Sequence, residues 1–172
     1  MFRKATLSDL DAVARIYEDI HTEIEAGRYP VRWVRGVYPT FSTAAEAVNN
    51  GDLYVYEEDG VILAAARINR EPVPAYADAR WLWPEPDGGA MILHTLVVSP
   101  KSAGRGLGKK FVRFYEDTAR ENGVACLRLD TGETNTVARQ LYKSLGYREA
   151  DIVSCTFNGI PGIRLVCIEK RL

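Results

Sequence analysis

Apolar residues recur along this chain at spacings that predict both helices and strands. Five of them follow steps of three and four residues, which is the period of one helix face: Leu10, Val13, Tyr17, Ile20 and Ile24. We expect this helix to begin near Ser8, whose hydroxyl suits an N-cap, and to end at Gly27. Thr43-Ala-Ala-Glu46 has the pattern of a capping box, which predicts a short second helix that stops near Gly51.

Shorter apolar runs without a helical period predict strands. Residues 53–57 and 61–69 flank Asp59-Gly60, and Asp-Gly between two apolar runs is a strong hairpin signal. Residues 90–98 are almost wholly apolar, as in a central strand covered on both faces. The other expected strands cover residues 2–5, 125–130, 147–157 and 164–170. We expect an exposed sheet edge after Arg164, which would allow two copies to pair as a homodimer.

Two more helices and two long loops complete the pattern. An amphipathic helix is expected from residue 107 to Asn122-Gly123, and a shorter one over 136–145. Residues 28–42 and 70–89 are rich in aromatic residues and proline, so we predict irregular loops there. Long loops in compact domains are commonly functional, and we expect part of a substrate pocket in them.

Composition narrows the class of protein. The chain has 172 residues and a formal net charge of −1, so we expect neither nucleic acid nor an anionic membrane as a partner. Its three cysteines are far apart and fit neither a disulfide framework nor a zinc site, and we expect no metal. No signal peptide or membrane-spanning run is visible, and these features predict a cytoplasmic protein.

A glycine-rich turn is the strongest chemical signal. The strand over 90–98 is followed by Ser-Pro and then by Gly104-Arg-Gly106-Leu-Gly108-Lys109, at the start of a helix. Glycines let the backbone approach an anion, and a helix start supplies free N–H groups. A nucleotide P-loop is excluded, because it needs four residues before its Gly-Lys and a following Ser or Thr. A dinucleotide fingerprint fits poorly, since the spacing is wrong and the turn lies late in the chain.

Two blocks resemble the GCN5-related N-acetyltransferase (GNAT) superfamily. The family's Arg/Gln-x-x-Gly-x-Gly/Ala signature is matched at Gly106 and Gly108, with Ala103 where Arg or Gln is usual. A second family block, Asn-x-x-Ala-x-x-Leu-Tyr followed by Gly and an aromatic residue, is matched throughout by residues 135–147. The two blocks occur in the family's order, and the resemblance extends over nearly the whole chain.

The resemblance implies an α+β fold and an activity. The expected architecture is a mixed, largely antiparallel sheet of about seven strands flanked by about four helices, in three α/β/α layers. Residues 1–172 are expected to form a single acetyl-CoA-binding domain. The implied reaction is direct transfer of acetyl from acetyl-CoA to a primary amine of a small molecule or peptide. A CoA-binding sensor or partner-binding module without transferase activity is the alternative.

The resemblance also implies a cofactor site. The CoA pyrophosphate would meet the backbone N–H groups of residues 104–109, with Arg105 and Lys109 as candidate sources of positive charge. The pantetheine arm would pair with the backbone of Leu96, Val97 and Val98, in the manner of an added strand. The full set of expected cofactor-binding residues is Leu96, Val97, Val98, Gly104, Arg105, Gly106, Gly108, Lys109, Asn135, Ala138 and Tyr142.

Tyr142 and His94 are the candidate catalytic residues. In the family, the tyrosine at the position of Tyr142 is the usual general acid, which protonates the departing thiolate. His94 is two residues from Leu96 on the same strand face, and an imidazole suits the role of general base. A water chain is an alternative base, and Asp130, Glu133 and Asp78 are weaker candidates.

Aromatic residues mark the expected acceptor pocket. Trp33, Tyr38, Trp81 and Trp83 lie in the two irregular segments where the family forms that pocket. Their rings would attract an ammonium group, or they would simply cover the sheet. The expected pocket residues are Trp33, Tyr38, Trp83 and His94, and none of them identifies the acceptor.

Overall fold

The chain folds as alternating helices and strands in a computed structural model that describes residues 1–83 and 89–172. Its helices are α1 (Leu10–Glu25), α2 (Phe41–Asn49), α3 (Leu107–Glu121) and α4 (Thr136–Ser144). Its strands are β1 (Phe2–Lys4), β2 (Leu53–Glu58), β3 (Val61–Asn69), β4 (Ala90–Val98), β5 (Cys126–Gly132), β6 (Arg148–Phe157) and β7 (Ile160–Arg171). Part of the predicted loop over 70–89, residues 84–88, lies outside the described residues.

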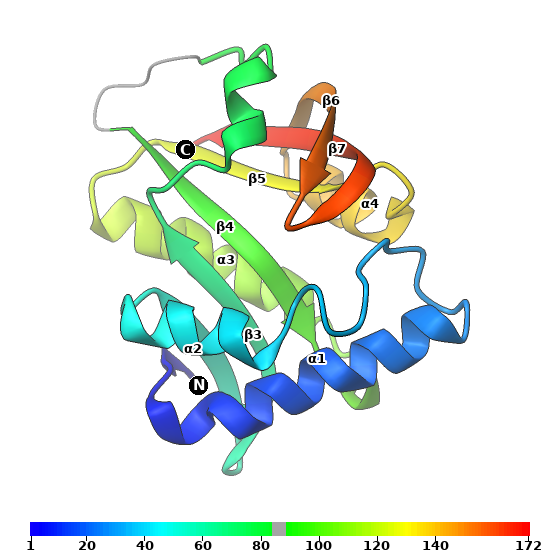
Figure 1. The fold of residues 1–172 in the computed structure, drawn as a ribbon. Coiled ribbons are helices and arrows are strands. Elements are labelled where there is room, and N and C mark those ends of the chain that lie inside the picture. Colours follow the sequence, from blue (N-terminus) through cyan, green and yellow to red (C-terminus); the bar gives the residue numbers. More distant parts are fainter. Residues whose placement is uncertain (84–88) are drawn as a thin grey trace.

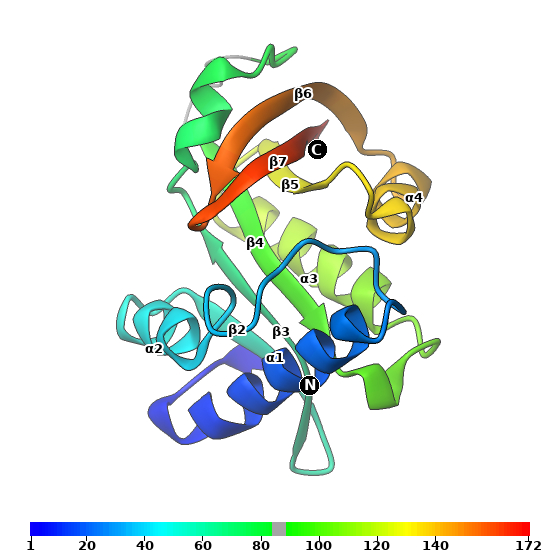
Figure 2. The same cartoon turned by 45° about the vertical axis from the view of Figure 1, so that its right-hand side comes forward.

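The seven strands form one sheet between two layers of helices. Their order is β1-β2-β3-β4-β5-β7-β6, and every described neighbour pair is antiparallel except β4 and β5. Helices α1 and α2 cover one face of the sheet, and α3 and α4 cover the other (Figures 1 and 2). The predicted mixed, largely antiparallel sheet in three layers is therefore confirmed.

Each helix layer has its own apolar core. Val13, Tyr17 and their neighbours on α1 pack with α2 against β2 and β3. On the other face, Phe111 and Tyr115 of α3 are fully buried against β4 and β5, and the Tyr115 hydroxyl donates to Met91 O at 2.5 Å and to Arg128 O at 3.0 Å. Burying a side chain of this size contributes about 1.5–3 kcal/mol, so the two helix layers fix the sheet from both sides.

Strands β4 and β5 are paired over only part of their length. The register runs from Ala90 opposite Cys126 to Leu93 opposite Leu129, and beyond that point the strands separate (Figure 2). Within the described chain, β4 has no strand partner on this side after Leu93. The divergence opens a gap in the middle of the sheet, with unpaired backbone groups on one wall.

A β-bulge lies on β4 at the start of this gap. Ala65 is opposite Val97 and Arg67 is opposite His94, so two residues of β4 face Ala66 alone. One of the two, Thr95, has a φ of +50°, in the left-handed region that side chains other than glycine rarely adopt. Bulges bend a strand and change the direction of its side chains, and they are enriched next to active sites.

Both N-terminal helices are capped differently from the prediction. Thr6 and Asp9 form a capping box ahead of α1, so Ser8 is not its cap. Helix α2 begins at Phe41, because Thr40 is extended and acts as the N-cap. Thr43 occupies the third helical position, and its hydroxyl accepts the Thr40 N–H at 3.0 Å. The predicted capping box at Thr43 was therefore three residues late.

The C-terminal hairpin is longer than predicted. Strand β7 begins at Ile160, directly after a tight turn at Asn158-Gly159 in which both residues have positive φ. The predicted strand began at Arg164, whereas β7 also includes Pro161 and Gly162, two residue types that are uncommon inside strands. In the sheet, β7 lies between β5 and β6. The predicted exposed edge after Arg164 is therefore wrong, and the outer strand on that side is β6.

Candidate functional site

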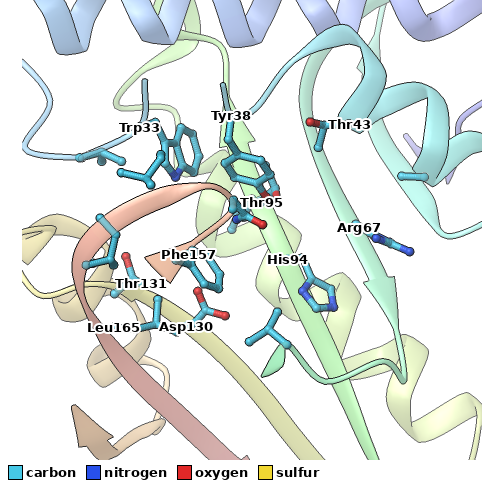
Figure 3. Close-up of a pocket in the computed structure, with 18 of the residues that line it drawn as sticks. Trp33, Tyr38, Thr43, Arg67, His94, Thr95, Asp130, Thr131, Phe157 and Leu165 are labelled. Atoms are coloured by element: carbon cyan, nitrogen blue, oxygen red, sulfur yellow. Dashed lines mark hydrogen bonds between the residues drawn. The ribbon is translucent and has the colours of Figure 1, made fainter. Parts of the chain in front are cut away.

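The gap between β4 and β5 contains a cavity of about 540 Å³. Its walls come from the segment between α1 and α2, from β3, β4 and β5, from α4 and from the β6–β7 hairpin (Figure 3). Cavities of about 300–1,000 Å³ are typical of sites for small ligands. The site is therefore built by segments far apart in the sequence that meet where the sheet splits.

The glycine turn lies between β4 and α3, and none of residues 104–109 is among those that line the cavity. Gly104 and Gly106 have φ of +77° and +69°, and Gly106 is the N-cap of α3. The first N–H groups of a helix have no intrahelical acceptor, and here the first helical bond is from Lys110 N–H to Gly106 O at 3.0 Å. The turn therefore presents several backbone donors and the positive end of a helix dipole.

The charged residues of this turn differ in their partners. Arg105 forms an ion pair with Glu58 at the end of β2. Its guanidinium group is thus occupied by the β2–β3 hairpin. Within the described ranges, Lys109 has no ion-pair partner, and its side chain is exposed. The third glycine has a packing role, because a Cβ on Gly108 would lie 3.3 Å from Leu141 Cδ2 on α4.

The expected pantetheine wall is the free side of β4. Val97 is 2% exposed and packs among the α1 and α2 residues, whereas Leu96 lines the cavity. Val97 and Val98 pair with β3 through Ala65 and Ala64. Their β5 side is open, so this segment has room for an extended ligand alongside its backbone.

Helix α4 brings three expected residues to the cavity. Asn135 is its N-cap, and its Oδ1 accepts the Ala138 N–H at 3.2 Å. Asn135, Ala138 and Tyr142 all line the cavity. Tyr142 is only 6% exposed, and burial raises the pKa of its hydroxyl. Among the described residues that hydroxyl has no hydrogen-bond partner, and its oxygen keeps some surface accessible to solvent.

His94 is held by a chain of hydrogen bonds on the β3 side. Asn69 Nδ2 donates to Asp52 Oδ2 at 2.8 Å, and Asn69 Oδ1 accepts the Glu71 N–H at 3.0 Å. These two bonds fix the orientation of the amide, so His94 Nε2, 2.9 Å from the same Oδ1, must donate a proton to it. The neutral ring therefore carries its lone pair on Nδ1.

The pKa of His94 is lower than that of a free imidazole. Burial lowers it to about 4, and the positive charge of Arg67 acts in the same direction. Arg67 is opposite His94 in the sheet and is itself paired with Asp52 at 2.8 Å. His94 is thus a neutral hydrogen-bonding group over the physiological pH range, and only a weak base.

Asp130 stands on the opposite wall of the gap. Its Oδ2 accepts a hydrogen bond from the Tyr76 hydroxyl at 2.8 Å. Its Oδ1 has no partner in the described part of the chain and is open to the cavity that Asp130 lines. Burial raises the pKa of this carboxyl group to about 6, and the Tyr76 hydrogen bond opposes the shift. Asp130 therefore changes charge close to neutral pH.

The aromatic residues of the two irregular segments separate into two groups. Trp33 and Tyr38 line the cavity, with ring centroids 5.9 Å apart, and the Tyr38 hydroxyl is hydrogen-bonded to Thr95 (Figure 3). Trp81 and Trp83 are not among the lining residues. The Arg128 guanidinium lies 4.2 Å from the Trp81 ring centroid, and it donates to Trp83 O at 2.6 Å.

Trp83 therefore lies outside the cavity lining, and its predicted place in the acceptor pocket is wrong. The turn Pro74–Asp78 directs Tyr76, rather than the tryptophans, toward Asp130. Two other candidate bases also lie apart from the cavity lining. Asp78 is exposed, and Glu133 forms an ion pair with Arg164 at 2.9 Å.

Several lining residues were not anticipated. Phe157, Asn158 and Ile160 reach the cavity from the tip of the β6–β7 hairpin. The Asn-Gly pair at 158–159 between apolar residues is a hairpin signal that would have predicted this tip. Asn69 had no such signal, because its contact with His94 depends on the register of β3 against β4.

The described residues contain neither a candidate membrane span nor a candidate metal site. None of their helices has the length and apolar character needed to cross a membrane. Across residues 1–83 and 89–172, no three His, Cys, Asp or Glu side chains are grouped so as to hold a metal ion.

Comparison with known families gives a match over most of the chain. The model of the acetyltransferase (GNAT) family matches residues 13–147. The uncharacterized N-acetyltransferase MJ1207 of Methanocaldococcus jannaschii is 25% identical over 153 residues, which are 88% of this chain and 62% of that protein. The [ribosomal protein bS18]-alanine N-acetyltransferase of Escherichia coli is 37% identical over 60 residues, 35% of this chain and 40% of that protein. The matches thus cover less than two thirds of these curated relatives' length.

Solved structures share the fold. A GNAT family acetyltransferase from Streptococcus agalactiae superposes with a TM-score of 0.81 at 22% identity, covering 100% of this chain and 95% of that one. The structure of yncA from Salmonella typhimurium with its cofactor acetyl-CoA gives a TM-score of 0.71 at 18% identity, covering 100% and 93% of the two chains. At these identities the likeness shows the fold.

Proposed function

This chain belongs to the acetyltransferase (GNAT) family, and we propose from this premise that it transfers acetyl from acetyl-CoA to a primary amine. Residues 1–172 would act as one catalytic domain. The observation that carries the proposal is the meeting of three groups at the split in the sheet. An accessible carboxylate oxygen of Asp130, the imidazole of His94 and the free hydroxyl of Tyr142 all line one cavity.

The cofactor would use the free backbone groups of the turn before α3 and of the open side of β4. The N–H groups of the Gly104–Lys109 turn would bind the pyrophosphate of CoA. The unpaired side of β4 beyond Leu93 would pair with the amide groups of pantetheine. This arrangement would direct the thioester toward Tyr142, because Asn135, the N-cap of α4, and Ala138 and Tyr142 within the helix line the same cavity.

The amine would enter between the two arms of the gap. An ammonium group is attracted by the Asp130 carboxylate, and the His94 Nδ1 lone pair can accept one of its N–H groups. Asp130, with a pKa of about 6, accepts the proton as general base. His94 orients the amine, since its pKa of about 4 makes it the weaker base.

The acetyl group then passes directly from the thioester to the amine. The amine nitrogen attacks the thioester carbonyl carbon, and a backbone N–H on the free side of β4 stabilises the negative charge on the carbonyl oxygen. As the carbon–sulfur bond breaks, the thiolate takes the proton of the Tyr142 hydroxyl, and the second proton that the acylated nitrogen must lose passes through water to restore the tyrosine. The products are an N-acetylated amine and free CoA.

Two measurements test this function. Acetyl-CoA at 100 times its dissociation constant should stabilise the chain by about 2.7 kcal/mol, seen as a rise in Tm. Free thiol should then appear when amines are added with acetyl-CoA. Stabilisation without thiol release for any amine would favour a CoA-binding sensor, and absence of stabilisation would exclude both functions.

A further inference from the structure

Residues 28–40, here called the strap, connect α1 to α2 and are fastened to the α1 side of the cavity. Arg35 forms ion pairs with Glu18 and Glu25 of α1. His21, which is 1% exposed, has its Nε2 3.0 Å from Pro39 O. These contacts join the strap to α1.

The strap also reaches the opposite wall of the cavity. The Thr134 hydroxyl, in the loop between β5 and α4, donates to Pro30 O at 2.8 Å. Arg32 Nη1 donates to Gly162 O on β7 at 2.6 Å. At the hairpin tip, a Cβ on Gly159 would lie 3.5 Å from Val37 Cγ1. Both ribbon views show the strap passing between α1 and the β6–β7 hairpin (Figures 1 and 2).

The inner side of the strap forms part of the acceptor space. Trp33 and Tyr38 face the cavity opposite His94 and Asp130, and the Tyr38 hydroxyl is hydrogen-bonded to Thr95 on the β4 bulge (Figure 3). Phe157 closes the space from the hairpin side. The strap is thus joined to α1, to β4, to the β5–α4 loop and to the hairpin, so it spans from one wall of the cavity to the other.

We infer that the acceptor is a small-molecule amine and not the N-terminus or a lysine of a polypeptide. This inference rests on the proposed function. A polypeptide acceptor needs an open groove, because each extended residue adds about 3.3 Å of chain with substituents on both sides. Here the strap spans the two walls that such a groove would separate. The cavity of about 540 Å³ must also hold the thioester end of the cofactor, which leaves room for a compact amine.

The first test compares acceptors. Thiol release above the amine-free background is measured with a panel of small primary amines and with peptides of increasing length that begin with alanine. The best small amine should give a kcat/KM at least about tenfold above that of any peptide, because the strap excludes the longer chains. Titration calorimetry of the same amines into CoA-bound protein should give the same order of affinity.

The second test loosens the strap. The double variant Arg32→Ala/Thr134→Val removes both hydrogen bonds to the far wall. It should raise the ratio of kcat/KM for bulkier amines to kcat/KM for the best small amine, while stabilisation by acetyl-CoA stays as in the wild type. Arg28→Ala is the matched control, since Arg28 pairs with Glu23 on the α1 side only and should leave the ratio unchanged.

The possible outcomes distinguish a failure of this inference from a failure of the proposed function. Acetylation of peptides as fast as the best small amine, or a ratio that the double variant leaves unchanged, overturns the inference and leaves the transferase activity standing. A chain that binds acetyl-CoA but turns over no amine of either class overturns the proposed function, and the inference with it.

Discussion

His94 and Asp130 are the first residues of β4 and β5 beyond the last paired position of the two strands, Leu93 opposite Leu129. Residues at equivalent positions of a parallel pair point to the same face of a sheet. Both side chains therefore enter the same cavity, one from each arm of the gap (Figure 3). Their environments differ, because burial lowers the pKa of His94 to about 4 and raises that of Asp130 to about 6.

Turnover should depend on the charge of Asp130. Only the carboxylate accepts a proton, so kcat should rise tenfold per pH unit below pH 6 and level off above it. Asp130→Asn should lower kcat by about 10²–10⁴-fold and remove this inflection. The pH–rate profile of kcat, measured with saturating amine and acetyl-CoA, checks the assignment. An inflection near pH 6 that persists in the Asn variant would show that another group titrates.

The same carboxyl group should make stability depend on pH. Its pKa in the folded chain, about 6, is above the ordinary value of 3.8, so its contribution is favourable below pH 3.8 and is lost as pH rises through 6. Asp130→Asn should therefore raise the free energy of unfolding by about 1–3 kcal/mol at pH 8 and much less at pH 4. Urea unfolding at the two pH values measures the difference. Equal effects at both would contradict a raised pKa.

Tyr142→Phe should separate chemistry from binding. The substitution keeps the ring that packs 5.9 Å from Tyr147 and removes only the hydroxyl. We expect kcat to fall by about 10²-fold or more, with the Kd for acetyl-CoA within a factor of about two. Tyr147→Phe is a suitable comparison, since that hydroxyl is buried and does not line the cavity. Unchanged turnover in Tyr142→Phe would remove it from the reaction.

Asn69 should control the tautomer of His94. In Asn69→Leu, the acceptor for His94 Nε2–H is lost, and the ring can carry its proton on either nitrogen. The ¹⁵N chemical shifts of the imidazole should change from a single Nε2–H form to a mixture, and KM for the amine should rise. Acetyl-CoA binding provides the control, because Asn69 lies on the acceptor side. A ring that keeps one tautomer in this variant would refute the assignment.

Asp9 should contribute stability that is lost in acid. It accepts two hydrogen bonds from Arg3, at 2.7 and 2.9 Å, and caps the turn before α1 through the Thr6 N–H. Arg3 holds the pKa of Asp9 at about 2, below its usual 3.8, so the stabilisation is present above pH 3.8 and disappears as pH falls through 2. Asp9→Asn should lower the free energy of unfolding by about 1–2 kcal/mol at pH 7. The loss is limited to this size because Arg3 is partly exposed and water weakens its ion pair with Asp9.

Local sequence signals predicted most of the fold. The helical period from Leu10 to Ile24, the Asp59-Gly60 turn and the apolar run over 90–98 each appear as expected. Errors occurred at boundaries where two signals compete. Thr40 and Thr43 are both acceptable caps, and only the extended backbone at Thr40 decides between them.

The candidate site was less predictable, because it depends on contacts between distant segments. Tyr142 and Asn135 were found through a local motif. Asp130 looked no better than Glu133 in the sequence, and the difference between them arises from burial beside Tyr76, 54 residues away. The course of the strap depends on Arg32 reaching Gly162, a contact across 130 residues that no local pattern encodes.

The contact at Gly108 has a consequence for the length of the cofactor. Gly108 lies in the first turn of α3, and a Cβ there would be 3.3 Å from Leu141, the residue before Tyr142. The glycine-rich turn and the Tyr142 hydroxyl thus belong to two helices in direct contact. The separation between them is set by this close packing, whereas a flexible loop would let it vary. A methyl group at position 108 would require the Leu141 side chain to shift by a few tenths of an ångström, so the absence of a side chain at Gly108 is what lets the two helices lie this close and fixes the span that a cofactor must bridge.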